Sequence, residues 1–503
     1  MELARVLAGL PVIAVAGDLS RDVTQICYDS RRCSAGALFV ALRGLLYDGH
    51  EYVSEALEKG ARCVVHEKDI PHYRGVTTVR VADSRRALST LAANFHGRPS
   101  KRLFVTGITG TNGKTTITCL LESILKAAGI KAGIIGTISC RYNDVELVST
   151  HTTPESPDLQ HMLETMADAG VSHVVMEVSS HAVDRDRVAD VDFQRGVFTN
   201  LSSEHLDYHG SMEAYFSVKK RFFTELLKKN PAVVNSDDHW GRRLAAEIEN
   251  PLVTYGIDGD RDVKTTAYSL TMDGMTAVVQ SPRGSISLSS KLTGMFNLSN
   301  VLAAVALAIT LDIPSSSIVA GIENAAVIPG RLERVPSREL SVFVDYAHTE
   351  DGLRNVLATL RAFEHSRLIT VFGCGGDRDR TKRPLMGRTA VELSDCTVIT
   401  SDNPRDENPA AIIREIEAGI NGSTVRKATP SDPVVAEGKE YRIIEDRSEA
   451  IAWAIAAAVP GDIVLIAGKG HEEYQIIGNK RIPFDDRRVA VQCLRARGAG
   501  SES

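Results

Sequence analysis

The stretch GITGTNGKTT, Gly107 to Thr116, lies between an apolar run and a helical pattern. The apolar run Leu103–Val105 is typical of a buried strand, and from Leu120 to Leu125 apolar residues recur at helical spacing. A strand that turns through glycines into a helix is the usual setting of a phosphate-binding loop. The stretch therefore predicts a nucleotide site in an α/β fold.

The loop departs from the strict G-x-x-x-x-G-K-[ST] pattern, because Ile108 stands where that pattern has its first glycine. The free N–H groups and the dipole of a helix start still favour an anion. Lys114 would reach the β- and γ-phosphates of ATP, and the Thr115 hydroxyl would bind Mg²⁺. An ordinary glycine turn with a solvent-facing lysine is the alternative, but strand, glycines, lysine, threonines and helix all agree with a phosphate site. The predicted ATP contacts of the loop are Gly110, Thr111, Asn112, Gly113, Lys114, Thr115 and Thr116.

Bulk properties indicate a globular protein of several domains. A chain of 503 residues is too long for one core and predicts about three domains. A net charge of -6 with dispersed lysine and arginine argues against a nucleic-acid partner. We find no apolar run of membrane-spanning length and no clear signal cleavage site, so we expect a cytoplasmic protein without membrane insertion. The eight cysteines include no C-x-x-C pair, which favours reduced, packed thiols.

The pattern along the chain divides it into three blocks, 1–98, 99–329 and 330–503. The first block has short strands at 38–41 and 63–65 and ends in the polar segment 97–101. In the second and third blocks β-rich runs alternate with helical stretches, which predicts largely parallel sheets. A polar, strand-like insert spans about 253–292. In open α/β sheets ligands bind beyond the carboxyl ends of the strands, so the functional residues are expected there.

Two residues at neighbouring strand ends of the second block are candidates for a metal site. Glu177 closes one predicted strand, and His205 follows another. Alone, each reads as a capping or surface residue, and histidine is an unusual ligand for Mg²⁺. Their shared position beside the phosphate loop favours a divalent metal site.

An ordered set of motifs resembles the Mur ligases of peptidoglycan synthesis over nearly the whole chain. The motifs are GTNGKTT (110–116), MEVSSH (176–181), FTNLSSEHLDYHG (198–210), FNLSNVLAA (296–304), PGRLERV (329–335), VDYAHTEDGL (344–353), GCGGDRDRTKRPLM (373–386), SDNPR (401–405) and AGKGHEEYQ (467–475). The family loop is G-T-N-G-K-[ST], which accounts for Ile108. The resemblance implies three domains, for the uridine nucleotide, for ATP on a P-loop ATPase-like parallel sheet, and for an amino acid on a Rossmann-like fold.

The reaction implied by the resemblance is ATP-dependent amide formation by a monomeric enzyme. ATP phosphorylates the D-glutamate carboxylate of UDP-N-acetylmuramoyl-L-alanyl-D-glutamate, and an amine displaces phosphate from the acyl phosphate. Catalysis then consists mostly of positioning and charge neutralisation.

The resemblance also assigns residues to ATP and to Mg²⁺. It gives catalytic roles to Lys114, Lys219 and His205, and metal positions to Thr115, Glu177, His205 and Lys219. In this family the lysine that Lys219 matches is carbamylated by carbon dioxide, because a carbamate offers anionic oxygens that an ammonium lacks. Without the resemblance to this family, Lys219 would be interpreted as a solvent-exposed lysine on a helix. Further matches to ATP contacts are Asn297, Asn300, Arg331 and Asp345.

The nucleotide-dipeptide substrate is matched by residues of the first two blocks. Ser30 and His50 are on the uridine side, while Thr152, Thr153, Ser179 and Arg187 are on the dipeptide side. Arg185 stands where many relatives have glutamine, which leaves its substrate contact open. Asp184 or Asp186 is an alternative partner for it.

The third block decides which amino acid is added. The tetrapeptide Asp402-Asn-Pro-Arg405 matches the diaminopimelate-adding members, and the expected contacts are Arg378, Asp402, Asn403, Pro404, Arg405, Gly468 and Glu472. A guanidinium can grip the distal carboxylate through two parallel hydrogen bonds, and Glu472 can accept from the distal ammonium. A plain proline turn is the alternative reading of this tetrapeptide.

Two other functions remain to be weighed against a diaminopimelate ligase. Folylpolyglutamate synthetases share the fold and the chemistry, but the Asp402–Arg405 tetrapeptide and the motif Tyr28-Asp-Ser-Arg31 speak against a folate acceptor. A nucleotide-regulated ATPase or binding protein would instead hydrolyse ATP without a carboxylate substrate.

Overall fold

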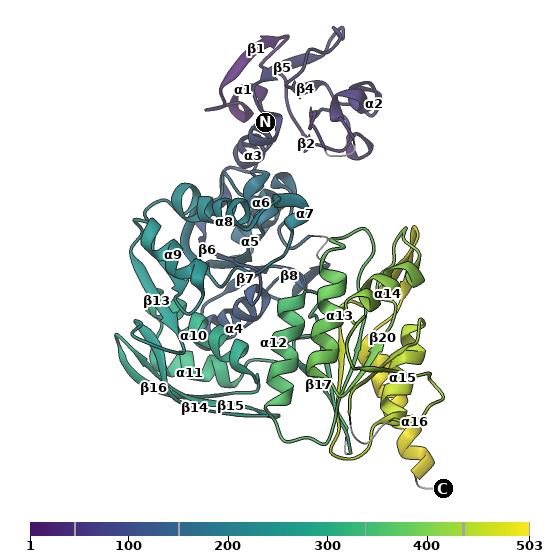
Figure 1. The fold of residues 1–503 in the computed structure, drawn as a ribbon. Coiled ribbons are helices and arrows are strands. Elements are labelled where there is room, and N and C mark those ends of the chain that lie inside the picture. Colours follow the sequence, from purple (N-terminus) through teal and green to yellow (C-terminus); the bar gives the residue numbers. More distant parts are fainter. Residues whose placement is uncertain (45–46, 149–150, 338, 435–437, 502–503) are drawn as a thin grey trace.

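The chain folds into three units, each built on its own β-sheet (Figure 1). The structure is a computed structural model that describes residues 1–44, 47–148, 151–337, 339–434 and 438–501. In the described ranges the main sheets have five, eleven and seven strands, and a separate two-stranded hairpin lies near the C-terminus. This arrangement confirms the α/β fold class. The three sheets fall within the three predicted blocks.

The first unit is a mixed sheet in the order β1-β5-β4-β3-β2. β1 is antiparallel to β5 and the other neighbours are parallel. Both strands expected here are present, as β3 and β4. The strands are β1 (Val12–Ala16), β2 (Gln25–Cys27), β3 (Ala37–Val40), β4 (Cys63–His66) and β5 (Thr77–Val81), and the helices are α1 (Leu3–Val6), α2 (Val53–Glu58) and α3 (Ser84–Phe95). α3 leads from this unit to the central one (Figure 1).

The central sheet has the order β16-β15-β14-β13-β12-β11-β6-β10-β7-β8-β9. Its middle, from β13 to β7, is parallel, as the alternation of strands and helices predicts. The strands are β6 (Phe104–Thr109), β7 (Ala132–Ile135), β8 (Ser139–Tyr142), β9 (Val145–Val148), β10 (His173–Glu177), β11 (Phe193–Phe198), β12 (Ala232–Asn235), β13 (Leu252–Gly256), β14 (Val263–Thr271), β15 (Gly274–Ser281) and β16 (Gly284–Ser290).

Helices cover both faces of this sheet and form two hydrophobic cores. One core contains Leu120 of α4 and Val301 of α10, and the other contains Leu159 of α5 and Tyr215 of α8. α8 runs directly into a π-helix at Phe222–Leu226. The helices are α4 (Lys114–Ala127), α5 (Ser156–Asp168), α6 (Ser180–Asp184), α7 (Leu206–His209), α8 (Met212–Arg221), α9 (His239–Glu247), α10 (Met295–Thr310) and α11 (Ser315–Glu323).

The predicted polar insert is an antiparallel meander, β14 to β16, that extends the central sheet. At the turn between β14 and β15, Met272 packs against the hydrophobic core of the third unit. The next residue, Asp273, forms an ion pair with Arg334 of that unit. The turn is therefore a contact point between the second and third units.

The third unit is a sheet in the order β17-β18-β23-β19-β20-β22-β21, parallel except for β17. Two hydrophobic cores pack against it, as a Rossmann-like fold requires. The strands are β17 (Glu333–Val335), β18 (Ser341–Asp345), β19 (Leu368–Phe372), β20 (Cys396–Ile399), β21 (Arg426–Lys427), β22 (Glu440–Ile443), β23 (Ile463–Ala467), β24 (Tyr474–Ile477) and β25 (Lys480–Pro483), and the helices are α12 (Glu350–Arg361), α13 (Lys382–Leu393), α14 (Pro409–Ala418), α15 (Arg447–Ala457) and α16 (Asp486–Ser501).

Two expectations from composition can be compared with this fold. All eight cysteines lie in the described ranges, none forms a disulfide, and six are buried. Across the described helices, none combines the length and the apolar character that a bilayer crossing needs.

Candidate active site

The phosphate loop joins β6 to α4, as predicted, and two of its glycines have no room for a side chain. Gly110 has φ 146°, and a Cβ atom there would lie 1.8 Å from Thr199 Oγ1. Gly113 has φ 88°, and its Cβ would lie 2.3 Å from Asn300 Oδ1. Since both positions combine positive φ with close neighbours, only glycine fits them.

Lys114 is the first residue of α4, and its ammonium lies inside the loop. Nζ donates to the carbonyl oxygens of Gly110 at 2.9 Å and Thr111 at 2.7 Å. Burial lowers the pKa of Lys114, while the carboxylates of Glu204 and Glu177 oppose that shift. The loop thus holds a cation where a bound phosphate would need one.

Glu177 ends β10 beside this loop and is almost fully buried. Its carboxylate accepts hydrogen bonds from Thr115 Oγ1 at 3.1 Å and from Thr137, whose N and Oγ1 both lie at 2.9 Å. Glu177 and Thr115 are therefore neighbours, as the predicted metal site requires. The sequence analysis did not single out Thr137.

His205 precedes α7 in a left-handed conformation, with φ 56°. Its Nε2 lies 3.8 Å from Glu204 Oε2, and the other Glu204 oxygen lies 3.2 Å from Nε2 of His348 in the third unit. Burial raises the pKa of Glu204, but the hydrogen bond with His348 and the charge of His205 lower it by more, so the net shift is downward. An anionic Glu204 beside a proposed metal position was missed, although it lies in the FTNLSSEHLDYHG motif.

Lys219 of α8 is buried, with 1% of its surface exposed, so the reading as a solvated lysine is wrong. Its Nζ donates to Gly110 O at 2.9 Å and lies 4.9 Å from the centroid of the Tyr215 ring. Burial lowers the pKa of Lys219 well below its ordinary value, and the nearby charge of Lys114 lowers it further. Burial therefore favours the unprotonated amine of Lys219, which is the form that reacts with carbon dioxide.

A cavity of about 550 Å³ lies between the second and third units and is lined by residues of both. Arg331 reaches across, with its NH2 3.3 Å from Thr115 Oγ1, and Asn112 Nδ2 donates to Asp351 Oδ2 at 2.9 Å. Sequence-predicted residues that line the cavity are Thr111, Asn112, Gly113, Lys114, Thr115, Thr116, Thr152, Glu177, Ser179, His205, Asn300, Arg331 and Asp345.

Two of the predicted ATP contacts from the family have roles within the protein. Asp345 accepts from the backbone N–H groups of Leu332 at 2.6 Å and Ala347 at 2.7 Å, which fixes its carboxylate at the cavity wall. Asn297 does not line the cavity. It donates to Thr293 O at 2.9 Å and accepts from Asn300 Nδ2 at 3.1 Å, so it orients Asn300.

The predicted dipeptide contacts of the second unit form one hydrogen-bonded group next to the cavity. Thr153 Oγ1 donates to Glu177 O at 2.8 Å and accepts from the N–H of Ser179 at 3.0 Å. Arg187 donates to Thr153 O at 3.0 Å and forms an ion pair with Glu155 at 2.9 Å. The Oγ1 atom of Thr152 lies 3.0 Å from the Oγ1 atom of Thr137.

Arg185 does not form the ion pair that was an alternative for it. Its Nε donates to Tyr208 OH at 3.2 Å, and Tyr208 in turn donates to Asp184 at 2.6 Å. Asp186 lies 3.7 Å from Arg221, which also lies 4.0 Å from Asp184. Because the phenol and Arg221 engage the two carboxylates, Arg185 remains stacked on the Tyr208 ring.

Ser30 and His50 lie in the first unit and do not line the cavity between the other two. Ser30 Oγ donates to Glu55 at 3.0 Å. His50 Nδ1 lies 2.6 Å from Asp48, and its Nε2 accepts from the N–H of Glu67 at 3.2 Å. Both side chains are held by neighbours of the same unit.

The predicted amino-acid site lies at the carboxyl ends of β19, β20 and β23. Asn403 Nδ2 donates to Glu472 at 2.8 Å, and the fully buried Lys469 donates to both residues at 3.0 Å. Gly468 has φ 117°, and a Cβ there would lie 2.7 Å from the Asp402 carboxylate. The structure therefore brings these predicted residues together, with Lys469 as a neighbour that was not foreseen.

Two guanidinium groups complete this site. Arg405 has φ 51° and donates to Gly376 O at 2.7 Å, and the carbonyl of Pro404 packs so close to Gly376 that no Cβ fits there. Burial and the neighbouring charge of Arg405 lower the pKa of Arg378. Within the described part of the chain neither arginine has a carboxylate within ion-pair distance, so both charges are available to an anion.

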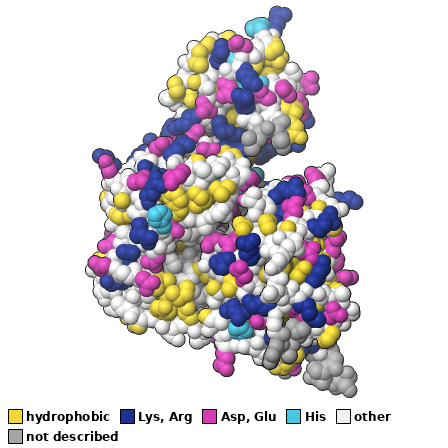
Figure 2. Space-filling view, in the orientation of Figure 1, with side chains coloured by type: hydrophobic (Ala, Val, Ile, Leu, Met, Phe, Trp, Pro, Cys, Tyr) yellow, Lys and Arg dark blue, Asp and Glu magenta, His cyan; other side chains and the backbone are white. Residues whose placement is uncertain are grey.

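Charges of both signs are mixed over all three units on the face shown in Figure 2. This agrees with the dispersed lysine and arginine of the sequence. That face carries no extended basic surface of the kind a nucleic acid would need.

Three family descriptions match the chain, one in each unit. They are "Mur ligase family, catalytic domain" at residues 22–96, "Mur ligase middle domain" at 108–308 and "Mur ligase, glutamate ligase domain" at 330–470. A curated relative from Geobacter metallireducens is named UDP-N-acetylmuramoyl-L-alanyl-D-glutamate--2,6-diaminopimelate ligase. It is 45% identical over 487 residues, which cover 95% of each chain. A relative of the same name from Clostridioides difficile is 41% identical and covers 98% of this chain and 99% of its own.

Solved structures resemble the fold over the same length. A structure with that same ligase name is 31% identical, has a TM-score of 0.68 and covers 99% of both chains. MurF ligase from Thermotoga maritima, solved in complex with ADP, has a TM-score of 0.64 at 16% identity and covers 94% of this chain and 99% of its own. The second likeness bears on the fold alone.

Proposed function

The chain belongs to the Mur ligase family, and on that premise we propose that it is an ATP-dependent ligase that adds meso-diaminopimelate to UDP-N-acetylmuramoyl-L-alanyl-D-glutamate during peptidoglycan precursor synthesis. In this proposal residues 1–98 bind the uridine nucleotide, 99–329 bind ATP, and 330–503 bind the amino acid. The protein acts in the cytoplasm as a monomer.

One observation carries the choice of amino acid. Arg378 and Arg405 bring two cationic groups together beside Asn403 and Glu472, with no carboxylate partner in the described ranges. Diaminopimelate has a distal carboxylate, opposite in charge to the two arginines, and a distal ammonium, opposite in charge to Glu472. Lysine has only the ammonium.

The side chains around Glu177 fit a divalent cation. Buried carboxylate and hydroxyl oxygens are suitable ligands for Mg²⁺, and Glu177 and Thr115 supply them side by side. His205 and a carbamate on Lys219 would complete the set. Bound there, Mg²⁺ would neutralise charge on the phosphates of ATP.

The residues of the chain then have separate tasks in the reaction. The Lys219 amine, whose unprotonated form is favoured by burial, forms an N–C bond with carbon dioxide and loses a proton, which gives an anionic carbamate. Lys114 and Arg331 hold positive charge against the γ-phosphate while a D-glutamate oxygen attacks phosphorus and ADP leaves. The unprotonated amine of diaminopimelate, positioned by Asn403 and Arg405, attacks the acyl carbon and loses a proton to solvent, and inorganic phosphate leaves as its oxygen–carbon bond breaks.

Phosphate release with defined substrates tests this function. A ligase should release phosphate only with ATP, UDP-muramoyl dipeptide and diaminopimelate all present. Release with ATP alone would favour a nucleotide-regulated ATPase, and release with a folate acceptor and glutamate would favour a folylpolyglutamate synthetase. Light scattering tests the monomeric state.

A further inference from the structure

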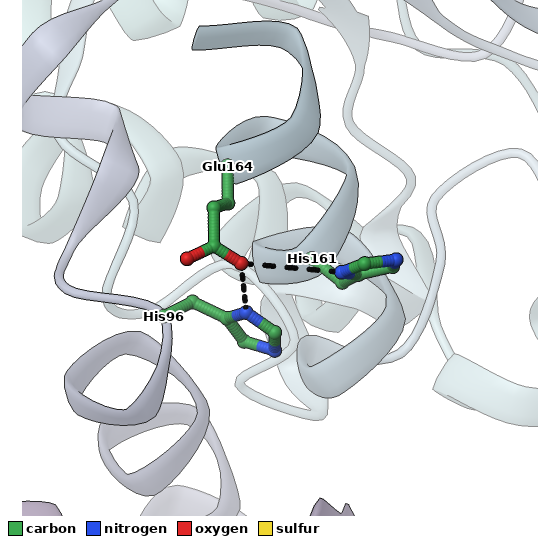
Figure 3. A group of neighbouring side chains, drawn as sticks. All are labelled: His96, His161 and Glu164. Atoms are coloured by element: carbon green, nitrogen blue, oxygen red, sulfur yellow. Dashed lines mark hydrogen bonds and ion pairs between the residues drawn. The ribbon is translucent and has the colours of Figure 1, made fainter. Parts of the chain in front are cut away.

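A cluster of two histidines and a glutamate lies outside the proposed active site, where the first unit meets the second (Figure 3). His96 directly follows α3 of the first unit. His161 and Glu164 are three residues apart on α5 of the second unit, so they share one helix face. None of the three lines the cavity of about 550 Å³.

The three side chains point toward one another. His96 Nδ1 lies 2.7 Å from Glu164 Oε2, and His161 Nδ1 lies 4.0 Å from the same oxygen. One ligand atom from each residue lies within 4.8 Å of the other two. In a tetrahedral zinc site with bonds of about 2.1 Å, neighbouring ligand atoms are ~3.4 Å apart. Small side-chain rotations would therefore bring all three atoms to ligand positions.

From this geometry we propose that His96, His161 and Glu164 bind a divalent transition metal ion of the Zn²⁺ type. Two imidazole nitrogens and one carboxylate are ligands that Zn²⁺ accepts, whereas Mg²⁺ prefers oxygen ligands in an octahedron. His161 is exposed, with 68% of its side-chain surface accessible. Water can therefore occupy the fourth position.

Burial holds one of the three ligands in place. His96 has 13% of its side-chain surface exposed, and its Nδ1 already lies at hydrogen-bond distance from the Glu164 carboxylate.

A metal at this position would fasten the first unit to the second. The chain passes between them through residues 97–103, and Asp190 holds the junction by ion pairs to Arg86 and Arg98. The proposed ion adds a link between α3 and α5 at the same junction. It would leave the chemistry of the ligase site unchanged and limit how far the first unit can swing.

The test is zinc binding by the full-length protein after chelation and return to excess Mg²⁺. Calorimetric titration with ZnCl₂ should give stoichiometric binding in the wild type. His161→Gln and Glu164→Gln should weaken the affinity by at least about tenfold, because each removes one ligand. His72→Gln, which changes an exposed histidine of the first unit, is the matched control and should bind like the wild type.

A second measurement reports the ligand set directly. Co²⁺ added in place of Zn²⁺ should give the visible absorption bands of a four-coordinate site in the wild type and in His72→Gln, and lose them in His161→Gln. His161 is exposed, so its variant should fold normally. Equal zinc affinity of wild type, His161→Gln and Glu164→Gln would mean that His96 and Glu164 form a hydrogen-bonded pair only, and would overturn the proposal.

Discussion

Lys219 and Lys220 are adjacent residues with opposite surroundings. Lys219 is buried against Gly110, while Lys220 forms a surface ion pair with Glu247 at 2.7 Å. We expect Lys219→Ala to lower kcat/KM by about a hundredfold or more, because the metal site loses an anionic ligand. Phosphate release in bicarbonate buffer measures the effect, and Lys220→Ala is the control, with little expected change. Normal turnover of Lys219→Ala would remove the carbamate from the mechanism, and partial rescue by a small carboxylate would support it.

Arg405 should decide the choice between diaminopimelate and lysine. We expect wild type to prefer meso-diaminopimelate over L-lysine by roughly a thousandfold in kcat/KM, since lysine leaves the guanidinium without its partner. Arg405→Ala should damage diaminopimelate use far more than lysine use, and Arg405→Lys should not restore it. A competition assay with both amino acids measures the preference. If the preference is the same in Arg405→Ala, the residue does not contact the distal carboxylate.

His471 should make the protein less stable in acid. Burial and the charge of Arg331 lower the pKa of His471 to about 3 in the folded protein. In the unfolded chain it takes up a proton near pH 6.5, so the unfolded state binds more protons between the two values. The free energy of unfolding should therefore fall as the pH drops from 6.5 toward 3. Urea unfolding at pH 7 and pH 5 measures this change. The free energy of unfolding should fall less between the two pH values in His471→Gln than in wild type, whereas in His72→Gln it should fall as much as in wild type.

At the scale of elements, the turn from β6 into α4 depends on Gly110. Gly110→Ala would force Cβ against Thr199 Oγ1, which donates to Asn112 O at 2.6 Å and supports the loop. We expect loss of ATP-dependent turnover together with a lower melting temperature. Gly129→Ala is the control, because it also has positive φ, 73°, but no neighbour within 4 Å. It should cost about 1 kcal/mol of stability and leave turnover unchanged. Equal effects of the two changes would contradict a steric role for Gly110.

The elements that could be predicted from sequence are those with a strong local pattern. The short strands predicted at 38–41 and 63–65 became β3 and β4, because strands buried on both faces need continuous apolar residues. β1 was not predicted, although Val12–Ala16 is a continuous apolar run, and the structure leaves all five of its residues exposed rather than buried as such a run suggests. The π-helix after α8 was not predicted either, and its Phe222 and Phe223 lie in the core.

At the scale of the whole molecule, some of the residues missed at the site are those that depend on how the units meet. Glu204 and His348 contact each other across the cavity from different units, and so do Asn112 and Asp351. No spacing within one motif reveals such pairs. The order of strands brings the predicted residues together at the carboxyl ends of the strands, whereas the contact between units follows from side-chain complementarity over long sequence distances.

Met272 should help to hold the third unit on the second. It lies at the turn after β14 and packs on the core of the third unit. Met272→Ser should weaken the contact between the two units by about 1 kcal/mol and increase proteolysis in the connection 324–329. Tyr268→Ser, at an exposed position in β14, is the control and should leave the cleavage rate unchanged. Unchanged cleavage in Met272→Ser would mean that other contacts fix the third unit.

The turn between β14 and β15 has a mechanical consequence if the third unit rotates on the second. Arg334, which forms an ion pair with Asp273 at this turn, lies three residues from Arg331 in the chain, so Arg331 would lie close to a rotation axis that passes through the turn. In a rigid-body rotation, displacement grows with distance from the axis. Arg331 would then stay near the phosphate loop during the whole rotation, while side chains far from the turn would move furthest. We would then expect nucleotide to stay bound through the stroke that delivers and withdraws the incoming amino acid.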